Sequence, residues 1–237
     1  MTSKSKYRAL FFDAGGTLFC PHPSVGHIYA TVAAKYGAKV NEHEVEQIFR
    51  QEFGKRDKEI ALKAHASEKN EKEWWRELVR FVFSRFAPIE HFDEFFEDLY
   101  DVFARPEAWK LYPEVIPMLI ELKKRPLVLG IVSNWDSRLF SICEGTGIKK
   151  YFDFILASAV VGSAKPDSGI FNEALKQAGV SANQAMHVGD SIDNDFFGAK
   201  KAGVDALFIS RNGHGAEGVR AIHSLEEVVS FIDGDKV

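Results

Sequence analysis

The pattern that most constrains this chain is a set of short apolar runs that alternate with segments of helical periodicity. Each run is four to seven residues long and ends near a polar residue or a glycine. Continuous apolar runs are typical of strands buried on both faces, and their alternation with helices predicts βαβ units in a parallel sheet. The expected strands are Tyr7–Phe12, Leu127–Ser133, Phe154–Ala157, Ala185–Gly189 and Ala206–Ser210. The expected helices lie near residues 114–124, 136–145, 168–178, 194–202 and 224–232.

Residues 24–104 differ from the rest, because helical patterns run through them without a strand signal. Aromatic residues recur at helical spacing over residues 74–86, which favours the core of a helical bundle over an aromatic cofactor site. Two asparagines each stand three residues before a glutamate and resemble capping boxes; the pairs are Asn41–Glu44 and Asn70–Glu73. We expect four helices, near residues 24–36, 41–65, 71–86 and 90–104.

The length agrees with two unequal parts. Divided by about 150 residues per domain, 237 residues make roughly 1.6 domains. We predict an α/β core with a Rossmann-like, doubly wound parallel sheet, formed by residues 1–19 and 107–237. An all-helical insertion after the first strand, residues 20–106, makes up the remainder.

The composition excludes several classes of protein. An apolar fraction of 46% and a net charge of −4 rule out global disorder, and a pI near 6.1 argues against a dedicated nucleic-acid binder. The two cysteines, Cys20 and Cys143, make no disulfide framework. No apolar run approaches the length of a membrane span or a signal peptide. We expect a soluble cytoplasmic protein that binds neither nucleic acid nor a membrane.

Two motifs follow the ends of predicted strands. Asp13 comes directly after the first strand, and Gly15 and Gly16 follow it, so the backbone can turn tightly and approach a ligand. Asp13 could be a carboxylate nucleophile or an ordinary turn residue. At the end of the second strand, the hydroxyl of Ser133 and the amide of Asn134 could hold an oxyanion or form a turn.

Two further motifs complete the set. Lys165 precedes Pro166, which fits the first turn of a helix, and Lys165 could neutralise a phosphate or remain a solvated loop lysine. After the fourth strand, Asp190, Asp193 and Asp195 crowd together. Oxygen-rich clusters of this kind suit Mg²⁺, although acids also favour a helix N-terminus. Because the carboxyl ends of parallel strands meet at one edge, we expect all four motifs in one crevice.

Taken in order, the four motifs resemble those of the haloacid dehalogenase superfamily. The resemblance extends over essentially the whole chain, and the helical insertion has the position of the family's C1-type cap. Within the superfamily, the chain most resembles the subgroup called haloacid dehalogenase-like hydrolase domain-containing 3. The matching residues are Asp13, Thr17, Leu18, Ser133, Asn134, Lys165, Pro166, Gly189, Asp190 and Asp195.

The resemblance implies a Mg²⁺-dependent phosphatase that acts on a small phosphorylated molecule. Asp13 would attack phosphorus and become an aspartyl-phosphate. Ser133, with the backbone near Asn134, would hold a phosphoryl oxygen, and Lys165 would offset the negative charge. Asp195 would support the site through water or through Lys165. The implied metal site comprises Asp13, the carbonyl of Gly15, Asp190 and Asp195.

One position departs from the family's pattern. Phosphatases of this family carry a second Asp two residues after the nucleophile, where it protonates the leaving group and later activates water. Here Gly15 stands at that position. Acid–base help is worth about 10²–10⁴-fold, so we expect low or narrow activity. His22, in the loop that leads to the insertion, could replace the proton donor or be a turn histidine between two prolines.

Other readings remain open at this point. A 2-haloacid dehalogenase needs no metal and typically lacks a Gly-Asp pair such as Gly189–Asp190, whereas a phosphonatase would need a cap lysine for a Schiff base. A catalytically idle binding or regulatory module is a third reading. The loop at residues 211–215 could touch the site or form a plain surface turn. No Schiff-base lysine stands out among Lys35, Lys39, Lys55, Lys58 and Lys63.

Overall fold

The computed structural model describes residues 6–60, 66–211, 213 and 215–234, with only the backbone described at residues 57–60. Six strands form one sheet in the order β5–β4–β1–β6–β7–β8, and every neighbouring pair is parallel. The predicted α/β class and its five strands are confirmed. The strands are β1 (Ala9–Phe12), β4 (Val128–Ser133), β5 (Phe154–Ala157), β6 (Ala185–Gly189), β7 (Asp205–Ile209) and β8 (Ala221–Ile222).

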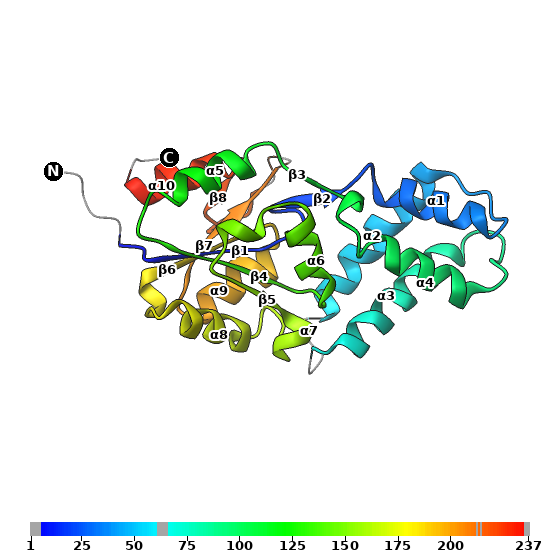
Figure 1. Ribbon diagram of the computed structural model, residues 1–237. Helices are drawn as coiled ribbons and strands as arrows, with labels where there is room; N and C mark the ends of the chain where they lie inside the picture. Colours follow the sequence, from blue (N-terminus) through cyan, green and yellow to red (C-terminus); the bar gives the residue numbers. More distant parts are fainter. Residues whose placement is uncertain (1–5, 61–65, 212, 214, 235–237) are drawn as a thin grey trace.

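The two faces of the sheet are both covered by helices. Leu10 and Phe12 of β1 belong to one hydrophobic cluster, and Ala9 and Phe11 belong to another, because successive side chains of a strand point to opposite faces. In Figure 1, α5 and α10 cover one face and α8 and α9 the other. These helices are α5 (Val115–Leu122), α8 (Ser168–Ala178), α9 (Gly198–Lys201) and α10 (Glu226–Asp233).

The remaining helices of this part are short. A π-helical turn, Ile192–Phe197, precedes α9, so the helix predicted near residues 194–202 begins earlier and in another form. Neither α7 nor β8 was predicted, because elements of four and two residues give almost no periodic signal. The other short helices are α6 (Arg138–Gly145), α7 (Ser158–Val161), η1 (Pro106–Ala108), η2 (Lys149–Tyr151) and η3 (Ala182–Gln184).

Four helices lie beside the sheet, at the right of Figure 1, and form a hydrophobic cluster of their own. Trp74 and Trp75 pack against Phe53 with ring centroids 5.7 and 5.9 Å apart, which confirms that these aromatic residues form a helical core. The last residues of the helix predicted over 41–65 lie outside the described part of the chain. The helices are α1 (Val25–Lys35), α2 (Glu42–Ile60), α3 (Glu68–Phe83) and α4 (Phe92–Val102).

One of the two predicted caps is correct. Asn41 Oδ1 accepts hydrogen bonds from the amides of the first turn of α2, at 2.9 and 3.2 Å. Asn70 is not the N-cap of α3, because this helix begins three residues earlier than predicted. The cap is Ser67, whose hydroxyl accepts a hydrogen bond from the Asn70 amide. Serine is as good a cap as asparagine, and its position is fixed only by where the helix packs.

The helices join the sheet part through a short antiparallel pair, β2 (Phe19–Pro21) with β3 (Trp109–Leu111). Side chains reinforce this junction, because Tyr100 Oη donates a 2.6 Å hydrogen bond to Asp136 Oδ2. The Glu68 carboxylate also accepts hydrogen bonds from the amide and hydroxyl of Ser137. Within the described ranges, no helix combines the length and apolar character required to span a bilayer.

Candidate active site at the carboxyl edge of the sheet

Strand register brings the predicted motifs to one edge. Phe12 of β1 pairs with Ile131 of β4 on one side and with Val188 of β6 on the other. The residues that follow these strands therefore emerge at the same edge. Asp13 is fixed there by its amide, which donates a 2.9 Å hydrogen bond to the Val188 carbonyl. The expected crevice edge is thus the place where the first, second and fourth motifs meet.

Asp13 is a buried carboxylate with two donors on one oxygen. Ser133 Oγ lies 2.9 Å from Asp13 Oδ1, and Lys165 Nζ lies 2.6 Å from the same atom. Burial raises the pKa of Asp13, and the positive charge of Lys165 opposes that rise. Without the lysine, a carboxylate at this depth would be costly to ionise.

Among the residues whose side chains the structure describes, Lys165 is the only buried lysine. It pairs with two acids. Its Nζ lies 2.5 Å from Asp195 Oδ1 as well as near Asp13, and only 2% of its side chain is exposed. Burial alone would lower the pKa of Lys165, but the charges of Asp13 and Asp195 overcome this and raise it. Pro166 precedes α8 and its cap Asp167, so it does not lie in the first helical turn as predicted.

The Asn134 side chain holds the backbone of Lys165. Its Oδ1 accepts a 2.7 Å hydrogen bond from the Lys165 amide, and its Nδ2 donates a 2.9 Å hydrogen bond to the Lys165 carbonyl. Both ends of the side-chain amide are therefore engaged in fixing the lysine. Sequence reasoning missed this role, because nothing local links two residues 31 positions apart.

Asp195 lies behind Lys165 and is itself surrounded by donors. Oδ1 also lies 2.8 Å from His187 Nε2, and Oδ2 accepts a 2.9 Å hydrogen bond from the Ser191 amide. Burial would raise the pKa of Asp195, but Lys165 and His187 hold it well below its usual range. His187 is completely buried, and burial lowers its pKa. Its part in the site was not foreseen from the sequence.

Three carboxylates form a cluster that could hold a metal ion. Oxygens of Asp13, Asp190 and Asp195 lie within 4.8 Å of one another. An all-carboxylate oxygen set fits Mg²⁺ by its donor chemistry. Asp195 uses three of the roughly four acceptor positions of a carboxylate, so at most one remains for a cation. Asp193 is exposed and is not part of this cluster.

The loop after Asp13 fits closely against Asp190. Gly16 has φ +76°, and a Cβ at this position would lie 2.0 Å from Asp190 Oδ2. Only glycine tolerates both this conformation and this approach. The second glycine of the motif therefore brings the exposed acid against the loop that carries Asp13.

Arg211, from the loop after β7, ties down the same loop. It donates hydrogen bonds to the carbonyls of Gly16 at 3.1 Å and Thr17 at 2.7 Å, and it pairs with Glu114 at 2.6 Å. Within the loop at residues 211–215, Arg211 thus contacts the segment that follows Asp13. Positions 212 and 214 of that loop lie outside the described residues.

Other candidates from the sequence lie elsewhere. His22 has an exposed side chain, and its amide donates a 2.8 Å hydrogen bond to the Ala108 carbonyl. Lys35, Lys39 and Lys55 are exposed. Neither the side chain of Lys58 nor any part of Lys63 is among the described residues.

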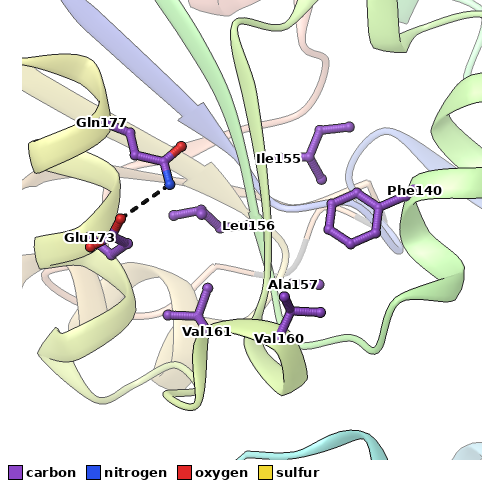
Figure 2. Close-up of a pocket in the computed structure, with 8 residues that line it drawn as sticks. All are labelled: Phe140, Ile155, Leu156, Ala157, Val160, Val161, Glu173 and Gln177. Atoms are coloured by element: carbon purple, nitrogen blue, oxygen red, sulfur yellow. Dashed lines mark hydrogen bonds between the residues drawn. The ribbon is translucent and has the colours of Figure 1, made fainter.

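A groove of about 390 Å³ lies at the β5 edge, away from these residues (Figure 2). Its polar side chains, Glu173 and Gln177, are hydrogen-bonded to each other at 3.2 Å. None of the predicted site residues lines it, so it adds nothing to the carboxylate cluster. The lining residues are Phe140, Ile155, Leu156, Ala157, Val160, Val161, Glu173 and Gln177.

Known proteins resemble this chain over most of its length. A family model described as haloacid dehalogenase-like hydrolase matches residues 7–203. A mouse protein, haloacid dehalogenase-like hydrolase domain-containing protein 3, is 33% identical over 213 residues, which cover 89% of this chain and 84% of the mouse protein. It carries the name of the subgroup expected from the motifs.

Two solved structures illustrate the fold. A haloacid dehalogenase-superfamily (HAD) phosphatase from Thermococcus onnurineus is 27% identical with a TM-score of 0.66, covering 97% of this chain and 100% of its own. An L-2-haloacid dehalogenase from Xanthobacter autotrophicus is 20% identical with a TM-score of 0.74, covering 97% of this chain and 100% of its own. At that identity the second likeness concerns the fold alone.

Proposed function

The chain belongs to the haloacid dehalogenase-like hydrolases, and from that premise we propose that it is a Mg²⁺-dependent phosphatase. In this proposal a small cytoplasmic phosphate ester binds at the carboxyl edge of the sheet. Helices α1–α4, within residues 20–106, act as a cap that selects the substrate and excludes water when closed. Asp13 becomes phosphorylated, and water then hydrolyses the aspartyl-phosphate and regenerates the carboxylate.

The observation that carries the proposal is the pairing of Asp13 with Lys165. Nζ lies 2.6 Å from Asp13 Oδ1, and the ammonium is held from behind by Asp195. Lys165 thereby favours the ionised form of a buried carboxylate, which a nucleophile requires. The same positive charge would stabilise the negative charge of an incoming phosphoryl group.

The metal would be held by the carboxylates of Asp13 and Asp190, the carbonyl of Gly15, and the remaining acceptor position of Asp195. When bound, Mg²⁺ supplies charge stabilisation to the phosphoryl oxygens. Asp190 is exposed and lies against Gly16, so it can accept a cation together with the substrate.

The chain's own residues divide the remaining tasks. The hydroxyl of Ser133, whose Oγ lies 2.9 Å from Asp13 Oδ1, can turn to a phosphoryl oxygen. The backbone amide of Asn134 is next to it in the chain. The carboxylate of Asp13 forms a bond to phosphorus while the ester P–O bond breaks. Gly15 offers no proton to the departing oxygen, so we propose that activity is low or confined to a narrow set of esters.

The test is hydrolysis of p-nitrophenyl phosphate by the wild type, Asp13→Asn and Asp193→Asn, each with Mg²⁺ and with EDTA. We expect slow, Mg²⁺-dependent turnover by the wild type and by Asp193→Asn, because Asp193 is exposed and outside the cluster. Asp13→Asn should be inactive. Equal rates for Asp13→Asn and wild type would overturn the aspartyl-phosphate proposal.

Two other outcomes would replace the proposal. Chloride release from 2-chloropropionate, without turnover of any phosphate, would indicate a dehalogenase-like hydrolase, and phosphonate cleavage alone would indicate a phosphonatase-like one. Binding of phosphate or Mg²⁺ without turnover of any of these compounds would indicate an idle binding or regulatory module.

A further inference from the structure

The space beside Gly15 is taken by the indole of Trp135. A Cβ at position 15 would lie 3.0 Å from Cζ3 and 3.6 Å from Cη2 of that ring. The backbone of Gly15 itself does not require glycine, because its φ is outside the left-handed region that Gly16 adopts at +76°. A side chain at position 15 is therefore crowded by a neighbour, which would have to shift by a few tenths of an ångström, and not by the turn.

Trp135 is held in this place from several sides. Its ring packs edge to face on Phe19 and Trp109, with centroids 5.8 and 5.0 Å away. Its amide donates a 3.1 Å hydrogen bond to Ser158 Oγ, and its carbonyl accepts one of 3.0 Å from the Ala159 amide. Phe19 is fully buried, so the indole cannot retreat in that direction without displacing packed atoms.

Trp135 also follows the end of β4, the strand that carries Ser133. It follows Ser133 by two positions, and the Ser133 hydroxyl contacts Asp13 Oδ1. Trp135 as a residue is only partly buried. An apolar aromatic ring thus lies against the position that the first side-chain atom of residue 15 would occupy.

We propose, on the basis of the phosphatase function above, that Trp135 is the specificity-determining residue of this site and restricts it to aryl phosphates. Two effects act in the same direction. The indole excludes a proton donor at position 15, so the leaving oxygen must depart as a stable anion. Its exposed surface offers an aromatic leaving group a ring to pack against.

The reaction balances without a donor at position 15. The Asp13 carboxylate bonds to phosphorus as the aryl P–O bond breaks, and the aryloxide leaves with the electron pair and takes its proton from bulk solvent. Water then attacks phosphorus, the P–O bond to Asp13 breaks, and both water hydrogens leave with the product as dihydrogen phosphate. Alkoxides are far poorer leaving groups, so alkyl phosphates need the proton that this site withholds.

The test compares phenyl phosphate with benzyl phosphate, which have the same ring and differ in the acidity of the leaving group. Four proteins are assayed with Mg²⁺: wild type, Gly15→Asp, Trp135→Ala and the double variant. We expect Gly15→Asp alone to bring no gain on benzyl phosphate, because the carboxyl group has no room. The double variant should exceed Trp135→Ala on benzyl phosphate by about tenfold or more, and its phenyl phosphate activity should change much less.

Two results would overturn the proposal about Trp135, and a third would overturn the phosphatase function on which it rests. A Gly15→Asp rate on benzyl phosphate equal to that of the double variant would mean that Trp135 excludes nothing. A double variant no better than Trp135→Ala would mean that space at position 15 is not the limit. If the wild type has no Asp13-dependent activity, the phosphatase proposal fails, and the packing argument is then decided by melting temperatures.

For that measurement, Gly15→Ala is made in the wild type and in Trp135→Ala, with Trp135→Leu as a second background if the alanine variant does not fold. We expect Gly15→Ala to lower the melting temperature by about 2–4 °C in the wild type and not in the other background. Gly54→Ala is the control, because a Cβ there meets nothing within 4 Å. Equal shifts in both backgrounds would show that Trp135 does not occupy the space.

Discussion

Lys165 Nζ lies 2.5 Å from Asp195 Oδ1, and each of these side chains is only 2% exposed. An ion pair at this depth contributes little by itself, but removing one partner leaves uncompensated charge in the interior. Since the same ammonium also faces Asp13, the loss of Lys165 would strand two carboxylates. We therefore expect Lys165→Met to lower the free energy of unfolding by about 3–5 kcal/mol in urea denaturation at pH 7.5.

The matched control is Lys176→Met, because Lys176 pairs with Glu173 at 3.2 Å with 78% of its side chain exposed. A change below about 1 kcal/mol is expected there. Adding Asp195→Asn to Lys165→Met should restore part of the lost free energy of unfolding, because one uncompensated buried charge is removed. Strictly additive losses in the double variant would contradict the shared ion-pair network.

Arg211 provides a second prediction, on the loop that follows Asp13. The guanidinium reaches two backbone carbonyls and Glu114, and it lies 3.4 Å from the ring centre of Tyr112. A lysine cannot reproduce this planar set of contacts. Arg211→Lys should therefore lower the free energy of unfolding by about 1–3 kcal/mol and reduce kcat more than it changes KM. Arg220→Lys is the exposed control, and an Arg211→Lys enzyme with unchanged kcat would show that the loop needs no such support.

The convergence of the four motifs was predictable because it depends on local signals and a general rule. Apolar runs mark where strands end, and parallel strands place their carboxyl ends at one edge. Asp13, Ser133 and Asp190 meet there for that reason alone. Glycine at position 16 was likewise read from the sequence as a tight turn, and the structure adds its close approach to Asp190.

The contacts that join distant side chains were not predictable in this way. Asn134 holds Lys165, Trp135 fills the space beside Gly15, and Arg211 reaches the loop after Asp13. Each contact depends on tertiary packing between segments that have no shared periodicity. The start of α3 was misplaced for a related reason, since both Ser67 and Asn70 are good caps and only packing selects between them.

Glu71 of α3 gives a prediction on pH. Burial raises the pKa of its carboxyl to about 7, and the nearby charge of Asp136 adds to this. An unfolded Glu titrates near pH 4.3, so this group stabilises the fold below about pH 4 and the benefit is lost as the pH rises through about 7. Glu71→Gln should therefore be more stable than the wild type by about 1–2 kcal/mol at pH 8 and nearly equal to it at pH 4.5.

The glutamine retains an oxygen for the Trp75 indole, which donates a 3.2 Å hydrogen bond to Glu71. Glu73→Gln is the control, because Glu73 is exposed on the same helix. Urea titrations at the two pH values measure both variants. A Glu71→Gln protein that is less stable than the wild type at pH 8 would show that the carboxylate is favourably charged.

His187 gives the last prediction, through its contact with Asp195. Its Nε2 lies 2.8 Å from Asp195 Oδ1, and its Nδ1, completely buried, has no hydrogen-bond partner in the described part of the chain. A second proton on Nδ1 would be left unsatisfied, so the folded state holds the neutral ring with the proton on Nε2. Burial accordingly lowers the pKa of His187.

The expected consequence is a stability difference that depends on pH. An unfolded histidine binds a proton below about pH 6.5, whereas the buried ring does not. The wild type therefore loses stability as the pH falls from 7.5 to 5.5, and His187→Phe lacks this loss. The phenylalanine keeps the packing against Phe171, whose centroid is 5.2 Å away, but removes one donor from Asp195. His187→Phe should lower the free energy of unfolding by about 1–3 kcal/mol at pH 7.5 and by less at pH 5.5.

Urea unfolding in EDTA measures this gap, the difference in free energy of unfolding between the variant and the wild type, without interference from metal binding. The control His43→Ala changes an exposed residue and should show no such gap at either pH. A gap that stays constant or widens on acidification would mean that the buried ring is already charged and that Asp195 is held by an ion pair on both sides.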